Sequence, residues 1–337
     1  MSIIDIHTHG IGGYETRGAT PRDILRIAEI HGSHGIDAII PTIYSGSIDE
    51  MRAAIAAVKK AMENQAAEGS GSRLEVQGSR LGNNRPTDKP VSDKTNTKNL
   101  EPRTLNLERR PRGDAPATIL GVHLEGPFLN PARAGALDGK SFLPAKTTHH
   151  KKLIEGFEEV IKIITVAPEL DGAPDLIRSI ADTGIIASMG HSDATYSEAE
   201  TGFNAGAKGI THIFNAMRGI HHREPGIAGF GLTNPHIYIE VIADPFHLHP
   251  KIIELIFSAN KPETIIIVSD SVKATQASAA AQGVADSTSR LFGGSMTLID
   301  SIEYLMGLGL QKRAVERCVS DNPERYLTGG PPLAGLP

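Results

Sequence analysis

Eight short segments rich in isoleucine and valine recur along the chain and constrain its fold more than any other feature. Near-continuous apolar runs of this length are typical of strands that are covered on both faces, as in a parallel sheet. The segments span residues 3–9, 36–42, 119–125, 161–167, 185–191, 209–215, 238–244 and 264–270.

Helical patterns separate most of these predicted strands. The first of them begins at Pro21, and Thr20 before it is a favoured N-cap residue. Eight strands alternating with helices predict an α/β fold of the (β/α)8 barrel type. A doubly wound open sheet is the alternative, weakened because no GxGxxG turn follows the first strand. The predicted helices span residues 21–31, 47–62, 175–183, 197–205, 250–258 and 301–308.

Residues 64–116 differ from the rest of the chain, because they are polar and rich in turn-forming residues. Their apolar residues follow no period, so we expect a disordered insertion, with a small, partly folded module as the alternative. The insertion precedes the third strand, which places it at the amino-terminal face of the barrel. The predicted organisation is therefore one barrel domain formed by residues 1–63 and 117–328, with a flexible tail at 329–337.

Composition excludes several classes of protein. The net charge of −5, the absence of tryptophan and an aromatic content of 4% give no platform for nucleic acid. No apolar stretch reaches the roughly 18 residues of a membrane helix, and the first residues lack a secretory signal pattern. The single cysteine, Cys318, cannot form an internal disulfide, and we expect a cytoplasmic protein.

Six histidine, glutamate and aspartate side chains, which are residue types that can bind a metal, lie where five of the predicted strands end. In a barrel, the carboxyl ends of the strands meet on one face, where active sites are found. Imidazole and carboxylate groups suit zinc or iron, and Asp270 is the natural proton carrier for a hydrolase. For His123 we favour a role as a core histidine. The predicted site residues are His7, His9, Glu125, His191, His212 and Asp270.

The motifs around these residues resemble those of N-acetylglucosamine-6-phosphate deacetylases, which belong to the amidohydrolase superfamily. The similar stretches include IIDIHTHG at residues 3–10, HLEGPFLNP at 123–131, GHSDATY at 190–196 and THIFNAM at 211–217. VAPE, REPGIAG, IADPFH, VSDS and LFGGSMTL follow the family order as well.

This resemblance implies a metal-dependent TIM-barrel hydrolase that removes acetate from a phosphorylated amino sugar. Glu125, His191 and His212 would bind the principal ion, His7 and His9 would help to hold a second one, and Asp270 would act as general acid and base. Zinc is the expected metal, with iron as an alternative.

The resemblance also assigns residues to the substrate. Arg223 and His247 would hold its phosphate group, and the arginine would come from a neighbouring subunit, which implies a homodimer. The other substrate-binding residues would be Ala136, Leu137, Asn215, Ala216, Leu291, Phe292 and Gly293.

Three departures from the family pattern leave alternatives open. Leu137 stands where the family usually has a histidine, most of the accessory β-sandwich domain is expected to be missing, and the insertion at 64–116 is unusual. The alternatives are a related amidohydrolase acting on another N-acyl sugar or on a cyclic amide, and a non-catalytic sugar-phosphate-binding relative.

Overall fold

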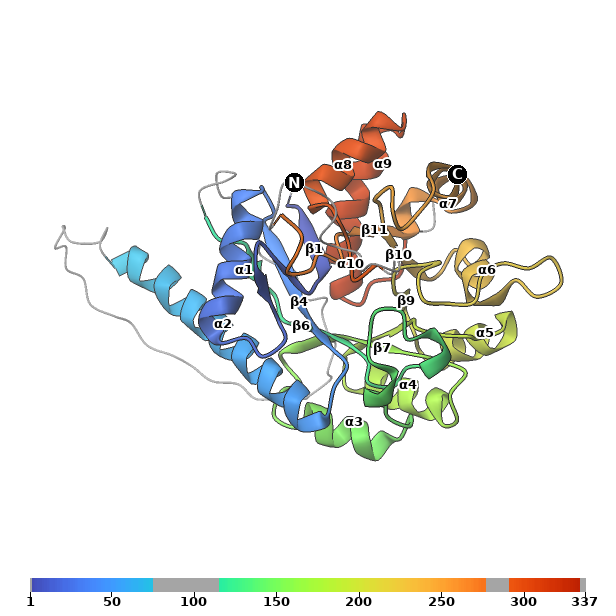
Figure 1. Ribbon diagram of the computed structural model, residues 1–337, viewed down its shortest axis with the longest axis horizontal. Coiled ribbons are helices and arrows are strands. Elements are labelled where there is room, and N and C mark those ends of the chain that lie inside the picture. Colours follow the sequence, from blue (N-terminus) through green and yellow to red (C-terminus); the bar gives the residue numbers. More distant parts are fainter. Residues whose placement is uncertain (1, 75–114, 277–290, 334–337) are drawn as a thin grey trace, which may run out of the picture.

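The structure, a computed structural model, describes residues 2–74, 115–276 and 291–333 (Figure 1). Most of the expected insertion, residues 75–114, and the end of the tail, residues 334–337, lie outside these described residues. Within the described part, no helix combines the length and the apolar character needed to cross a membrane. No β-sandwich accompanies the barrel among the same residues.

A ring of parallel strands forms the centre of the molecule, and it confirms the predicted barrel. The pairing order β1-β4-β6-β7-β8-β9-β10-β11 follows the chain order. A parallel bridge between Thr8 and Ser271 and a hydrogen bond of 2.9 Å from Asp270 N to His7 O close the ring, so the sheet is not open. The strands are β1 (Ile4–Thr8), β4 (Ala38–Tyr44), β6 (Val122–Glu125), β7 (Ile161–Val166), β8 (Ile186–Met189), β9 (Gly209–Ile210), β10 (Tyr238–Ile242) and β11 (Ile265–Val268).

Helices surround the strands on the outside of the barrel (Figure 1). Capping boxes at Thr20, Thr195 and Thr297 fix the first turns of three of them, because each threonine and the acidic residue three positions later satisfy each other's backbone N–H groups. The helices are α1 (Pro21–Ser33), α2 (Ile48–Leu74), α3 (Thr147–Ile154), α4 (Ala173–Asp182), α5 (Tyr196–Asn204), α6 (Gly226–Thr233), α7 (Pro250–Ala259), α8 (Leu298–Gly307), α9 (Lys312–Val319) and α10 (Asp321–Leu327).

Short elements complete the described part of the chain. A hairpin of β2 (Gly10–Ile11) and β3 (Tyr14–Glu15) follows the first barrel strand, and β5 (Thr118–Ile119) pairs with the beginning of β4. Three 3₁₀ turns, η1 (Pro131–Arg133), η2 (Gly139–Ser141) and η3 (Pro262–Thr264), lie in the loops.

Helix α2 corrects the boundary that we expected at residue 63, because it continues to Leu74. The Gln65 side chain explains part of this extension. Its Nε2 donates to Ala117 O at 2.9 Å, and its Oε1 accepts from Ile119 N at 3.0 Å. These bonds hold the helix against β5 at residue 65, and the helix continues to Leu74. In the tail, residues 329–333 carry no regular structure.

The barrel interior is apolar at the amino-terminal end of the strands and polar at the carboxyl end. Apolar side chains fill the interior at the amino-terminal end. They come from β1, β4, β7, β8, β10 and β11, together with Tyr326 of α10. The Tyr326 ring packs on Tyr238 with 5.0 Å between ring centroids. This packing closes the barrel at the amino-terminal ends of its strands. A ligand can therefore enter only at the polar, carboxyl ends.

Candidate functional site

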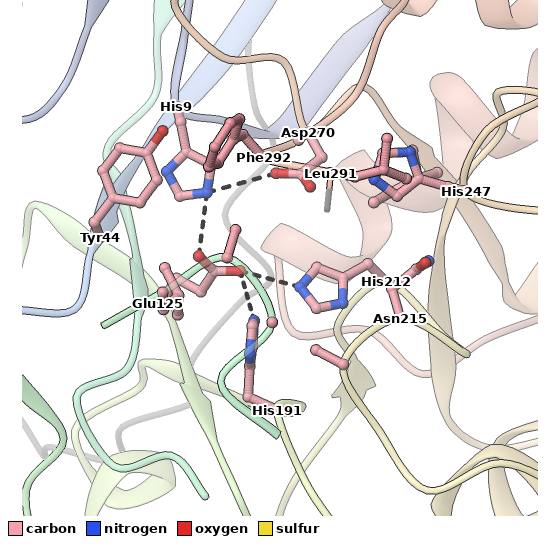
Figure 2. Close-up of a pocket in the computed structure, with 16 residues that line it drawn as sticks. His9, Tyr44, Glu125, His191, His212, Asn215, His247, Asp270, Leu291 and Phe292 are labelled. Atoms are coloured by element: carbon pink, nitrogen blue, oxygen red, sulfur yellow. Dashed lines mark hydrogen bonds and ion pairs between the residues drawn. The ribbon is translucent and has the colours of Figure 1, made fainter. Parts of the chain in front are cut away.

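A cavity of about 410 Å³ opens at the carboxyl ends of the barrel strands (Figure 2). It brings together every predicted site residue except His7, which is fully buried and does not line it, and Arg223. Its walls also include Tyr44, Gly135 and Ile242, which the sequence analysis did not identify. The predicted residues that line it are His9, Glu125, Ala136, Leu137, His191, His212, Asn215, Ala216, His247, Asp270, Leu291, Phe292 and Gly293.

Three imidazole rings converge on Glu125 in this cavity, as Figure 2 shows. Glu125 Oε1 lies 3.0 Å from Nε2 of His191 and 3.0 Å from Nε2 of His212. Its other oxygen, Oε2, lies 3.2 Å from Nε2 of His9. These groups come from the ends of β6, β8, β9 and β1, which are far apart in the chain. The convergence that the sequence predicted for strand ends is therefore present in the fold.

The backbone bends sharply where three of these side chains enter the cavity. His191, His212 and Asp270 have φ angles of 47°, 32° and 47°, in the left-handed region that residues with a side chain rarely adopt. Each of them follows shortly after the end of a barrel strand. Such backbone strain clusters at functional sites, where the surrounding fold stabilises it.

Hydrogen bonds at the far side of two rings fix which nitrogen faces Glu125. His9 Nδ1 lies 3.1 Å from Thr42 O, and His191 Nδ1 lies 3.0 Å from Arg133 O. A carbonyl oxygen can only accept, so in the neutral ring Nδ1 carries the proton and Nε2 presents its lone pair. Lone pairs directed at carboxylate oxygens need a cation or a proton between them, and this donor set fits a divalent metal ion.

The described residues contain three groups whose ligand atoms are close enough for an ion, and His7 belongs to all of them. Two groups share the cavity floor, namely His7 with Glu125 and His212, and His7 with His9 and Asp270. The third combines His7 with His123 and Glu240. In that group both nitrogens of His123 already have partners, Ile6 O at 3.3 Å and Thr165 Oγ1 at 2.8 Å. Burial lowers the pKa of His123 to about 3, so it is a neutral core histidine, as predicted.

Two carboxyl groups of the cavity have pKa values displaced in opposite directions. Burial and the charge of Glu125 raise the pKa of Asp270 well above its usual value. Burial would raise the pKa of Glu125 too, but the imidazoles of His191, His9 and His212 lower it well below its usual value. The two shifts differ because imidazoles surround Glu125, whereas the charge of Glu125 acts on Asp270.

His247 lines another part of the cavity, and Asp244 fixes its ring. Asp244 Oδ2 accepts from His247 Nδ1 at 2.9 Å and from Ser295 N at 3.0 Å. The sequence analysis missed Asp244, although an aspartate three residues before a histidine in IADPFH is a pattern that predicts a local turn.

Tyr44 is a further residue that sequence reasoning missed. Its ring stacks on His9 with 3.9 Å between centroids and an interplanar angle of 12°, and the Arg17 guanidinium lies 4.5 Å from the Tyr44 centroid. Tyr44 ends strand β4, next to the strand that carries His9, so its place beside the site follows from the barrel order.

The structure places Arg223 outside the cavity and Leu137 in its wall. Arg223 is exposed in the loop before α6 and does not line the cavity. Its predicted contribution to the site of a neighbouring subunit remains a prediction. Leu137 lines the cavity and is 6% exposed, so an apolar side chain occupies this part of the wall.

Comparison with known proteins gives relatives that are named as deacetylases of phosphorylated N-acetyl amino sugars. No family model matches the chain. An N-acetylglucosamine-6-phosphate deacetylase of Bacillus subtilis is 40% identical over 182 residues, which are 54% of this chain and 44% of the relative. That of Vibrio furnissii is 30% identical and aligns with 75% of this chain and 51% of its own length. An N-acetylgalactosamine-6-phosphate deacetylase of Escherichia coli O157:H7 is 27% identical, with 81% of this chain and 59% of the relative aligned.

The chain thus spans about half the length of the curated relatives it matches. Among solved structures, N-acetyl-D-glucosamine-6-phosphate deacetylase from Mycobacterium smegmatis superposes with a TM-score of 0.76 at 24% identity, covering 98% of this chain and 78% of that one. A mutant of that enzyme in complex with N-acetyl-D-glucosamine-6-phosphate gives a TM-score of 0.71 at 22% identity, covering 99% of this chain and 80% of that one. The predicted resemblance is confirmed: the relatives by sequence are deacetylases of N-acetylglucosamine-6-phosphate or N-acetylgalactosamine-6-phosphate, and the neighbours in fold are N-acetylglucosamine-6-phosphate deacetylases.

Proposed function

We propose that the chain hydrolyses the N-acetyl amide of N-acetylglucosamine-6-phosphate, giving glucosamine-6-phosphate and acetate. One observation carries the proposal. The Nε2 atoms of His9, His191 and His212 converge on Glu125 at the floor of a cavity, beside the carboxyl group of Asp270. The relatives named as deacetylases support the same reaction class.

The metal centre would be held by two sets of ligands. Glu125, His191 and His212, which the resemblance assigns to the principal ion, are in mutual contact through Glu125 Oε1. His7, His9 and Asp270, whose ligand atoms lie close enough to share an ion, would hold a second one. Mixed imidazole and carboxylate ligands favour zinc, with iron as the alternative. When bound, such an ion polarises the scissile carbonyl and makes water more acidic.

Asp270 would move the protons of the reaction. As a carboxylate it accepts one proton from the attacking water, whose oxygen bonds to the acetyl carbon. It then donates that proton to the amine nitrogen as the C–N bond breaks. Asp270 suits this exchange by its position, because its Oδ1 lies 3.5 Å from Nε2 of His9 and its side chain lines the cavity.

The remaining lining residues would bind the sugar and its phosphate. His247, oriented by Asp244, would donate to the phosphate, and Arg223 of a neighbouring subunit would contribute a guanidinium, so we propose a homodimer. The sugar and acetyl group would contact the other predicted residues, Ala136, Leu137, Asn215, Ala216, Leu291, Phe292 and Gly293. A cytoplasmic location is part of the proposal, in line with the buried free thiol of Cys318.

Replacing Asp270 tests the proposed chemistry. Asp270→Asn should lower the rate of acetate release by about 10²- to 10⁴-fold, because the amide cannot accept the water proton. Asp171→Asn, at an exposed position outside the cavity, serves as the matched control and should keep full activity. Acetate release is measured with both variants folded to the same extent, and undiminished turnover of Asp270→Asn would contradict the proposed role.

A related substrate is the second candidate, because Leu137 lines the cavity and the Escherichia coli relative is named for N-acetylgalactosamine-6-phosphate. The two phosphorylated sugars and unphosphorylated N-acetylglucosamine, compared by kcat/KM, separate the candidates. Preference for the unphosphorylated sugar would remove His247 and Arg223 from phosphate binding.

A further inference from the structure

Glu240 lies beneath the cavity, where none of the proposed chemistry uses it. It belongs to β10, is 1% exposed and does not line the cavity. Its Oε2 lies 3.1 Å from Nδ1 of His7, while its Oε1 is buried and has no hydrogen-bond partner in the part of the chain that the structure describes. A buried carboxyl group with so few partners is costly, so its contact with His7 needs a functional reason.

That contact couples the tautomer of His7 to the Glu240 side chain. When Nδ1 donates its proton to the Glu240 carboxylate, the opposite nitrogen, Nε2, carries the lone pair. The Nε2 atom is buried, has no hydrogen-bond partner among the described residues, and lies 3.4 Å from Asp270 Oδ1 and 3.6 Å from Glu125 Oε1. The lone pair therefore points at the place where two carboxylates and His9 could share a cation.

His7 differs in this respect from the two histidines whose Nδ1 faces a backbone carbonyl. Thr42 O and Arg133 O fix His9 and His191, and a side-chain substitution at either position would leave the carbonyl in place. At His7, the side chain of Glu240 takes the place of this carbonyl as the partner of Nδ1. The His123 ring packs edge-on against His7 at 4.6 Å, which restrains the ring sideways but cannot choose its tautomer.

We propose that Glu240 is a positioning residue for His7, which it holds in the tautomer that a second divalent cation at His7, His9 and Asp270 requires. The inference rests on the metal centre of the proposed function. It goes beyond that proposal by assigning control of the second ion to a residue that does not line the cavity and is not among the proposed ligands.

Metal-binding measurements without substrate test the inference. The wild type and the variants Glu240→Gln and Glu240→Leu are stripped with a chelator, and binding of Zn²⁺ and Co²⁺ is followed by equilibrium dialysis. We expect two ions per subunit in the wild type. In Glu240→Leu the second ion should bind about 10- to 100-fold more weakly, as for other residues that orient metal-bound histidines, while the first is unchanged. Glu240→Gln keeps an accepting oxygen, so its affinity for the second ion should lie between those of the wild type and Glu240→Leu.

Thr165→Val is the matched control for a packing defect. It removes the 2.8 Å bond to His123 in the same buried layer without touching His7, and it should keep both ions. If Glu240→Leu does not fold, weaker second-ion binding by Glu240→Gln still decides. Equal second-ion affinity in the Gln variant and the wild type, or a wild type that binds one ion, overturns the inference and leaves the proposed hydrolase intact. A wild type that binds no ion would overturn both the inference and the proposed metal-dependent hydrolase.

Discussion

Asp244 shows how much of a binding group's geometry depends on one buried carboxylate. Its Oδ1 accepts from the backbone N–H groups of Phe246 at 2.9 Å and His247 at 2.7 Å, and its Oδ2 accepts from the His247 ring and from Ser295. Burial would raise the pKa of Asp244, but the His247 side chain and these donors lower it to about 2. The loop after β10 and the loop that carries Leu291 and Phe292 are joined through this carboxylate.

Asp244→Asn should therefore lose stability in a way that depends on pH. A carboxyl whose pKa falls from 3.8 in the unfolded chain to about 2 in the folded one contributes its full stabilisation above pH 4, and loses it as the pH falls toward 2. At pH 7 the variant should be less stable by on the order of 2 kcal/mol. Urea unfolding at pH 7 and pH 3 measures the difference between wild type and variant, which should shrink at pH 3. A difference that stays constant or grows would contradict this assignment.

Helix α2 shows how a side chain can extend an element beyond its predicted end. Residues 66–68, two alanines and a glutamate, favour helix, but glycine and serine alternate over residues 69–72, and residues 64–74 look polar and non-periodic in sequence. The bonds of Gln65 to Ala117 and Ile119 join the helix to the strand that follows residues 75–114. This tertiary contact, rather than an amphipathic pattern, holds the helix at Gln65, past its predicted end at residue 62.

Gln65→Ala should weaken that junction. Loss of two partly buried hydrogen bonds is expected to cost about 1–3 kcal/mol in the free energy of unfolding, because the backbone groups of Ala117 and Ile119 lose their partner. Chemical denaturation measures the cost, and hydrogen exchange should report faster exchange at the Ile119 amide. Glu68→Ala, one turn later on an exposed side, is the control and should change neither. Equal behaviour of the two variants would show that the junction does not depend on Gln65.

At the scale of the whole molecule, the barrel holds several buried carboxyl and imidazole groups above an apolar floor. Asp5, Glu125, Glu240 and Asp270 lie at the same end as the converging histidines, all less than a tenth exposed. Such a cluster is costly in an otherwise packed interior unless a cation or protons neutralise it. The cluster therefore lowers the stability of the metal-free protein, and a bound ion can stabilise it.

Metal removal should lower the melting temperature. An ion that binds only the folded state adds about 2.7 kcal/mol at a free concentration 100 times its Kd, which corresponds to several degrees in Tm. Thermal unfolding with Zn²⁺ and after chelation measures the shift, and Glu125→Gln should lose most of it. A melting temperature that chelation leaves unchanged would contradict a metal site at Glu125.

The sequence by itself determined the barrel, its strand order and the residues at the strand ends. Apolar runs that alternate with helical patterns leave few other folds, and the carboxyl ends of parallel strands share one face. The prediction was less complete where local preference is weak. Helix α6 (Gly226–Thr233) was missed because its glycines are poor helix formers, and its helical form depends on burial of nearly the whole segment.

The tertiary structure alone decided how the site residues face one another. The predicted strand at residues 209–215 ends at Ile210, because His212, Phe214 and Ala216 adopt left-handed backbone conformations. The contacts of Glu240 with His7 and of Tyr44 with His9 carry no local signal, since the partners are distant in sequence. The turn pattern around Asp244 does not predict the orientation of the His247 ring. Patterns along a chain encode which faces are buried, whereas hydrogen-bond geometry between strands exists only after the barrel has closed.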